Sequence, residues 1–216
     1  MLEPFSLIFF DFDGTLCASE ADIRNAWCKT LSALSVECPS FDAVFKVGPS
    51  LAEMTSRLFP DRSEDFRQKI IVSFKNFYDD STFDETVPYP WVDAFLKKLV
   101  ANGKKIFVVT NKRKKPTSFL LKKFGWDRLF SDFYSPDSVP GKNSGKSELL
   151  GRALNDCGEK TSAALMVGDT AADIRAGNDN GMKTAGVVWG YGSRAELETA
   201  GADFILSEKD ISEWTR

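Results

Sequence analysis

Continuous apolar segments alternate with amphipathic, helix-like segments along most of this 216-residue chain. Apolar runs without a polar face are typical of strands that are covered on both sides. The alternation therefore predicts an α/β fold with a doubly wound, Rossmann-like parallel sheet. The strand-like runs are residues 6–10, 105–110, 163–168, 184–189 and 203–206.

One long segment interrupts this alternation, because no convincing strand-like run occurs between the first and second runs. An apolar stripe at helical spacing extends from Ile23 to Leu34, and further helix-like segments follow it. We therefore expect a small all-helical domain, residues 17–87, inserted after the first strand. Residues 1–16 and 88–216 would then form the α/β core domain.

The composition excludes several kinds of chemistry and partner. The chain has no histidine, which removes Ser-His-Asp hydrolases, Cys-His nucleophiles and histidine-ligated zinc sites. A net charge of −3 argues against a nucleic-acid partner, and no apolar run approaches the ~20 residues of a membrane span. The N-terminus has no basic region of a signal peptide, and the cysteines form no Cys-x-x-Cys pair. We therefore expect a cytoplasmic monomer or homodimer.

Polar side chains suited to phosphate or metal chemistry follow three of the predicted strands. Ligands of an open parallel sheet bind at the edge where the carboxyl ends of its strands meet. Carboxylates crowded there need a counter-charge, and Mg²⁺ prefers carboxylate oxygens, water and substrate phosphate. We therefore expect a Mg²⁺ site for a phosphoryl group, with Lys142 or Lys146 as a fixed positive charge. The side chains are Asp11 and Asp13, then Thr110 and Asn111, then Asp169 and Asp173.

These residues resemble the four motifs of the haloacid dehalogenase superfamily. The motifs are "DFDGT" at 11–15, "TN" at 110–111, a lysine, and "GDTAAD" at 168–173, in that order. The helical insert is similar to the small-helical (C1) cap of that superfamily. The stretches "VGPSLAEM" and "GVVWGYGS" are similar to those of phosphoglycolate phosphatase-like members. The resemblance implies a Mg²⁺-dependent phosphatase that acts on a small phosphorylated metabolite such as phosphoglycolate.

The resemblance also implies a role for each motif residue. Asp11 would be the nucleophile that accepts the phosphoryl group, and Asp13 would act as general acid and then general base. Lys146, which opens a helix-like run, is favoured over Lys142, which lies in a glycine-rich loop. The implied phosphate-binding residues are Thr110, Asn111, Gly14 and Lys146; the implied metal ligands are Asp11, Asp169 and the backbone carbonyl of Asp13; and Asp173 would orient a metal-bound water or Lys146.

Other functions fit part of the sequence. The segment "GKNSGKS" at 141–147 is close to the glycine-rich loop of a nucleotide-binding switch protein. Its two glycines are one residue too close together, and it lies far from the first strand. A sugar-phosphate mutase or another phosphotransferase, or a pyrophosphatase, would keep the same four motifs.

The insert would select the substrate, and its sequence is less informative than that of the core. An acidic substrate would need a cation, for which Lys46, Arg57 and Lys112 are the candidates. The aromatic side chains of the insert are interpreted as its packing core. They are Trp27, Phe66, Phe74, Phe77 and Tyr78.

Overall fold

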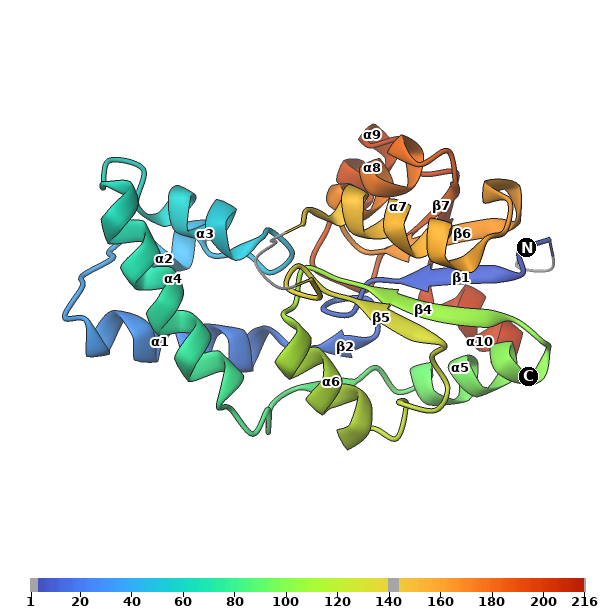
Figure 1. The fold of residues 1–216 in the computed structure, drawn as a ribbon, viewed down its shortest axis with the longest axis horizontal. Coiled ribbons are helices and arrows are strands. Elements are labelled where there is room, and N and C mark those ends of the chain that lie inside the picture. Colours follow the sequence, from blue (N-terminus) through green and yellow to red (C-terminus); the bar gives the residue numbers. More distant parts are fainter. Residues whose placement is uncertain (1–3, 140–143, 216) are drawn as a thin grey trace.

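A computed structural model describes residues 4–139 and 144–215, and in these residues six parallel strands form one sheet (Figure 1). The strands are β1 (Leu7–Phe10), β4 (Lys105–Val109), β5 (Asp132–Tyr134), β6 (Ala164–Gly168), β7 (Lys183–Val187) and β8 (Phe204–Leu206). Their order in the sheet is β5-β4-β1-β6-β7-β8, so β1 is central and pairs with β4 and β6. The predicted doubly wound α/β fold is confirmed.

Helices cover both faces of this sheet (Figure 1). The helices are α5 (Val92–Ala101), α6 (Lys114–Lys123) and α10 (Glu208–Thr215) on one face, and α7 (Lys146–Cys157), α8 (Ala171–Asp179) and α9 (Arg194–Thr199) on the other. In β1, Ile8 and Phe10 belong to the apolar cluster beneath α5, whereas Leu7 and Phe9 belong to the cluster beneath α7. Full burial of one such side chain stabilises the fold by about 1.5–3 kcal/mol. Burial on both sides explains why β1 has no polar face.

The insert, residues 17–87, lies beyond the carboxyl ends of the strands (Figure 1). Its helices are α1 (Glu20–Ala33), α2 (Phe41–Val44), α3 (Leu51–Leu58) and α4 (Glu64–Asp79). α1 packs on α4, where the ring centroids of Trp27 and Phe74 are 4.9 Å apart. The predicted packing role is wrong for Phe77, which lies on the outer side of α4 and is 37% exposed. The division of the chain into a core domain and a cap domain stays a prediction.

Three short strands were not predicted from the sequence. β2 (Cys17–Ala18) and β3 (Val87–Pro88) pair antiparallel where the chain enters and leaves the insert. Strands of two residues carry no periodic signal, so the sequence gives no indication of this ribbon. β5 has three residues, of which Tyr134 is buried, and is likewise too short to form an apolar run.

Candidate active site

The carboxyl ends of three adjacent strands form the floor of the site. Asp11 follows β1, Thr110 follows β4 and Asp169 follows β6. Each of these three residues is at most 2% exposed. The backbone N–H of Asp11 donates to Val167 at 2.9 Å, and that of Thr110 donates to Tyr134 at 3.0 Å. The sheet therefore brings these predicted residues together and fixes their backbone.

Three buried carboxylates form a cluster at this floor. One oxygen each from Asp11, Asp169 and Asp173 lies within 4.8 Å of the others. Burial raises the pKa of Asp11 to about 6; the Lys146 ammonium opposes this rise, and the charges of Asp173 and Asp13 add to it. Burial also raises the pKa of Asp169 well above its usual range. These oxygens suit a hard divalent cation, because it supplies the missing positive charge.

Lys146, the first residue of α7, lies between two of these carboxylates. Its Nζ is 3.0 Å from Asp11 Oδ2, and it also contacts Asp173 Oδ1. Burial by itself lowers the pKa of Lys146, but the two carboxylates outweigh burial and raise it. Asp173 in turn accepts hydrogen bonds from the backbone N–H and the hydroxyl of Thr170. Lys142, the alternative lysine, lies outside the described residues.

Asp169 is enclosed by two loops, one after β1 and one after β7. Its Oδ1 accepts a hydrogen bond from the Thr15 hydroxyl at 2.9 Å, and its Oδ2 accepts one from the Tyr191 N–H at 2.8 Å. Gly14 has a φ of +83°, and a Cβ at this position would lie 2.2 Å from Asp169 Oδ2. Glycine is thus required at position 14 by backbone conformation and by the carboxylate beside it. This requirement is separate from the predicted phosphate-binding role of Gly14.

Tyr191 also joins the edge of the sheet to the insert. Its hydroxyl accepts hydrogen bonds from the N–H groups of Ser19 at 2.8 Å and Glu20 at 2.9 Å, in the first turn of α1. Ser19 is the N-cap residue of α1, yet its own hydroxyl has no hydrogen-bond partner among the described residues. Trp189 Nε1 donates to the carbonyl of Thr15 at 3.1 Å. The loop after β7 therefore holds the segment through which the chain enters the insert.

Asp13 contacts a different cation from Asp11. Lys112 Nζ is 2.7 Å from Asp13 Oδ1 and also contacts the hydroxyl of Tyr78, which belongs to α4. Burial lowers the pKa of Lys112, but Asp13 and Tyr78 outweigh burial and raise it. Lys112 is therefore already paired inside the site. This pairing disfavours its predicted role as the partner of an acidic substrate.

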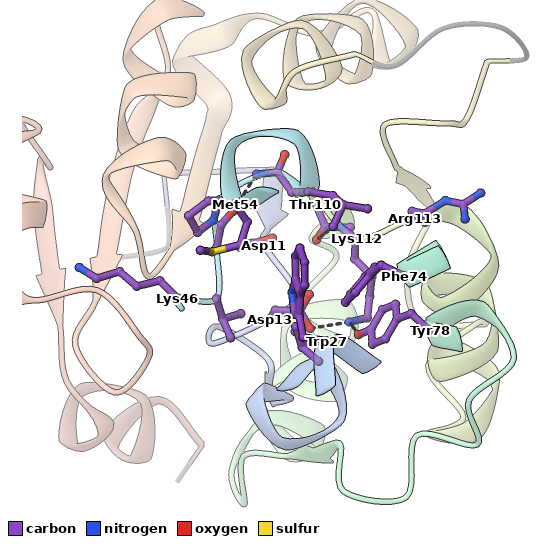
Figure 2. Close-up of a pocket in the computed structure, with 16 residues that line it drawn as sticks. Asp11, Asp13, Trp27, Lys46, Met54, Phe74, Tyr78, Thr110, Lys112 and Arg113 are labelled. Carbon is purple, nitrogen blue, oxygen red and sulfur yellow. Dashed lines mark hydrogen bonds and ion pairs between the residues drawn. The ribbon is translucent and has the colours of Figure 1, made fainter. Parts of the chain in front are cut away.

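A pocket of about 90 Å³ lies over Asp11 and Asp13 (Figure 2). The sheet supplies its polar floor, and the insert supplies apolar walls that include Trp27, Met54 and Phe74. This volume exceeds the roughly 10–15 Å³ that a cavity needs to hold one water. The pocket therefore suits a small ligand.

Asn111 connects the floor of the pocket to the insert. Its side-chain Nδ2 donates a hydrogen bond to the carbonyl of Gly48 at 2.9 Å. The neighbouring Thr110 hydroxyl accepts a hydrogen bond from the backbone N–H of Lys112 at 3.1 Å. The side-chain amide of Asn111 is thus occupied, while its backbone remains part of the predicted phosphate-binding turn.

The three cations predicted for an acidic substrate occupy different places. Lys46 lines the rim of the pocket and is exposed, and Figure 2 shows its amino group directed away from the floor. Arg57 is not among the residues that line this pocket; it lines a second pocket, which Lys46 lines as well. Lys112 is paired, as described above. Arg113 also lines the main pocket, but it forms an ion pair with Asp79.

The sequence does not predict the contacts that four residues make within the site. Thr15 belongs to the first motif and Tyr191 to "GVVWGYGS", so both lie in stretches that carry the family resemblance. The sequence predicts only a packing role for Tyr78 and only a substrate-binding role for Lys112. Their contacts join segments far apart in the chain, and no local sequence pattern encodes such contacts.

Helices long and apolar enough to span a bilayer are absent from residues 4–139 and 144–215.

Residues 8–187 match the family model of the haloacid dehalogenase-like hydrolases. A phosphoglycolate phosphatase from Aquifex aeolicus (strain VF5) is 34% identical over 202 residues, which are 93% of this chain and 92% of that protein. Pyrophosphatase PpaX from Bacillus cereus (strain AH820) is 31% identical, over 93% of this chain and 91% of that protein.

Solved structures agree with these sequence matches. The crystal structure of a "predicted phosphatase" from Clostridium acetobutylicum has a TM-score of 0.86 and 26% identity, and covers 95% of each chain. That of a "predicted phosphoglycolate phosphatase" from Haemophilus somnus 129PT has a TM-score of 0.82 and 25% identity, and covers 99% of each chain. The chain therefore belongs to the haloacid dehalogenase-like hydrolase family, and within it is similar to the phosphoglycolate phosphatases.

Proposed function

We propose that this hydrolase is a Mg²⁺-dependent phosphatase that cleaves a small phosphomonoester through an aspartyl-phosphate on Asp11. The observation that carries the proposal is the state of the Asp11 carboxylate. Its Oδ2 is held by Lys146, whereas its Oδ1 is buried without a hydrogen-bond partner among the described residues. A buried carboxylate oxygen without a partner is costly, and here it lies beneath the pocket that would receive the substrate. Oδ1 is therefore our choice for the attacking atom.

In the first half of the reaction, the Asp11 oxygen forms a bond to phosphorus, and the bond from phosphorus to the leaving oxygen breaks. Asp13 gives its proton to that leaving oxygen. In the second half, Asp13 takes a proton from water while the water oxygen bonds to phosphorus. The bond from Asp11 to phosphorus then breaks, which releases phosphate and restores the carboxylate. Lys146 and Thr110 would stabilise the negative charge of the phosphoryl oxygens.

The carboxylate cluster fits a divalent cation, as its close oxygens and raised pKa values indicate. Asp11, Asp169 and the backbone carbonyl of Asp13 would hold Mg²⁺, which when bound would neutralise charge on the phosphoryl group. Asp173 is engaged by Thr170 and Lys146, so it suits a supporting role behind these ligands.

The size of the pocket and the likeness to known phosphatases favour phosphoglycolate as the first substrate to test. Pyrophosphate is the second, because of the likeness to pyrophosphatase PpaX. A sugar-phosphate mutase would pass the phosphoryl group to a sugar hydroxyl instead of water. The nucleotide-switch alternative is disfavoured, because Lys146 contacts Asp11 and Asp173 rather than standing free for a nucleotide. The cytoplasmic location and the monomeric or homodimeric state stay predictions.

The experiment is phosphate release from these substrates, with rapid quenching and mass spectrometry of the peptide that contains Asp11. The native protein with Mg²⁺ should release phosphate and show a peptide heavier by one phosphoryl group, and a chelator should abolish both signals. Asp11→Asn should abolish both signals too, whereas Asp93→Asn, on α5 away from the site, should retain them. Turnover by Asp11→Asn, or full activity in excess chelator, would contradict the proposal.

A further inference from the structure

The ammonium group of Lys112 is buried between the sheet and the insert. Its side chain is 1% exposed, and its Nζ contacts Asp13 Oδ1 at 2.7 Å and the Tyr78 hydroxyl. The same Nζ lies 4.9 Å from the centroid of the Tyr78 ring and 5.6 Å from that of Phe12. Two aromatic rings, a carboxylate and a phenol thus surround one cation. A cation so enclosed has little freedom to leave Asp13.

The partners of Lys112 come from two parts of the chain. Lys112 lies in the turn after β4, which also carries Thr110, and Asp13 lies after β1, so both belong to the floor of the site. Tyr78 lies in α4 of the insert, where its ring stacks on Phe74 with centroids 5.3 Å apart. Figure 2 shows Asp13, Lys112 and Tyr78 in one line from the floor to the wall of the pocket. The Tyr78 hydroxyl of the insert is thus linked to the Asp13 carboxylate through Lys112.

The contact with Lys112 restrains one oxygen of Asp13. Oδ1 is occupied by the ammonium group, so the carboxylate is held in one orientation with respect to the pocket. Proton transfer requires a donor within hydrogen-bond reach of its acceptor, and a misplacement of about 1 Å can cost about 10²-fold in rate. The orientation of Asp13 is therefore a property on which the rate depends.

We propose that Lys112 and Tyr78 are positioning residues that hold Asp13 for proton donation to the leaving oxygen. This inference rests on the proposed function, because it takes Asp13 as the general acid. It assigns the insert a part in the chemistry, through Tyr78, in addition to its part in forming the pocket walls. The Tyr78 hydroxyl fixes the ammonium group of Lys112, and that group fixes the carboxylate of Asp13.

Leaving groups that differ in their need for a proton provide the test. Ethyl phosphate expels a strongly basic ethoxide, which must be protonated as it leaves. Acetyl phosphate is of similar size but expels a carboxylate, which needs no proton. If Asp13 is no longer held in position, cleavage of ethyl phosphate should become slower and cleavage of acetyl phosphate should not. General damage to the fold should slow the cleavage of both substrates. The readout is kcat/KM, which reports the steps up to departure of the leaving group.

Tyr78→Phe removes only the hydroxyl and keeps the ring contacts. We expect kcat/KM for ethyl phosphate to fall by about tenfold or more, within the roughly 10²–10⁴-fold worth of general acid catalysis. The value for acetyl phosphate should change by less than about threefold. Lys112→Met should lower kcat/KM for ethyl phosphate further and again spare acetyl phosphate. Asp13→Asn, which removes the proton donor itself, should give the largest loss of this kind. Tyr134→Phe removes a hydroxyl that bonds to Asp156 away from the pocket, and should leave both substrates unaffected.

Equal losses for the two substrates in Tyr78→Phe, or no loss for either, would overturn the inference. If Lys112→Met fails to fold, Tyr78→Phe alone decides, because it leaves the Lys112–Asp13 ion pair intact. Failure of the proposed function is distinguishable, since the native protein would then cleave neither substrate.

Discussion

Lys146 and Lys112 are both buried ammonium groups that contact an aspartate of the site, but different parts of the chain enclose them. The partners of Lys146 both belong to the α/β core: Asp11 follows β1, and Asp173 lies in the first turn of α8. Lys112 is shared between Asp13 of the sheet and Tyr78 of the insert. One end of the site is thus built by the core alone, and the other requires the insert to be in place.

This difference separates two tasks within the proposed reaction. Charge balance around the nucleophile is set by groups of the core, on α7, on α8 and at the end of β1. The orientation of the proton donor, Asp13, depends in part on α4 of the insert, which carries Tyr78. We therefore expect changes at Lys146 to affect every substrate alike, and changes around Lys112 to depend on the leaving group.

Lys146→Met should give the largest effect among the tests of this comparison. It leaves Asp11 and Asp173 buried without their cation, and breaking a buried ion pair costs about 3–5 kcal/mol. We expect a decrease of this order in the free energy of unfolding, measured with urea. Loss of one preorganised electrostatic group should also lower kcat by about 10²–10³-fold, equally for ethyl and acetyl phosphate.

The matched control for this change is Lys105→Met, which removes a lysine whose pair with Glu159 is exposed. It should alter neither stability nor kcat appreciably, because solvent screens such pairs. If kcat of Lys146→Met falls for ethyl phosphate but not for acetyl phosphate, the proposed division is wrong. Lys146 would then affect proton donation and not only the charge balance around Asp11.

Tyr191→Phe should have an intermediate effect, because it removes a contact between the core and the insert without touching either lysine. The N–H groups of Ser19 and Glu20 would lose their acceptor, at a cost of about 1–3 kcal/mol in unfolding free energy. KM should rise several-fold as the insert becomes less firmly held over the pocket. Ser19→Ala is the control, since the Ser19 hydroxyl has no hydrogen bond to lose among the described residues. An equal loss in both variants would argue against capping by Tyr191.

Asn111→Ala should have the smallest effect. It removes the hydrogen bond to the Gly48 carbonyl, worth about 0.5–1.5 kcal/mol, but keeps the backbone of the predicted phosphate-binding turn. We expect a rise in KM of a few-fold with kcat nearly unchanged, in steady-state assays. Asn178→Ala, whose side chain bonds to Ala200 far from the pocket, is the control. A large drop in kcat would instead assign the Asn111 side chain a direct role in the reaction.

The sequence predicts the end of the site that the sheet builds. Asp11 and Asp169 follow apolar runs, and strand ends in a parallel sheet meet at one edge, so the proximity of the two carboxylates can be inferred from the order of the runs. Lys146 opens a helix-like run, and its choice over Lys142 rests in addition on the family resemblance. For the two carboxylates, short-range patterns and one rule of topology are enough.

The end that the insert completes is not predictable in the same way. Helical periodicity indicates that Tyr78 is in a helix of the insert, but not that its hydroxyl faces Lys112. The position of α4 relative to the core is decided by many weak apolar contacts, and these leave no local pattern for the polar contact that results. The cap of α1 by Tyr191 is missed for the same reason. Ser19 occupies the N-cap position of α1, but its side chain makes no capping hydrogen bond among the described residues.

The capping of α1 by Tyr191 has a consequence for the order in which the chain can fold during synthesis. The N–H groups of Ser19 and Glu20 and the Tyr191 hydroxyl that accepts from them are 172 and 171 residues apart. A ribosome adds about 5–20 residues per second, so roughly 9–34 seconds separate the appearance of these two partners. For most of that interval β1 also lacks its neighbour β6, which the chain has still to supply. All residues of the insert are therefore made long before Tyr191, which caps α1, and the last quarter of the chain decides when the site is complete.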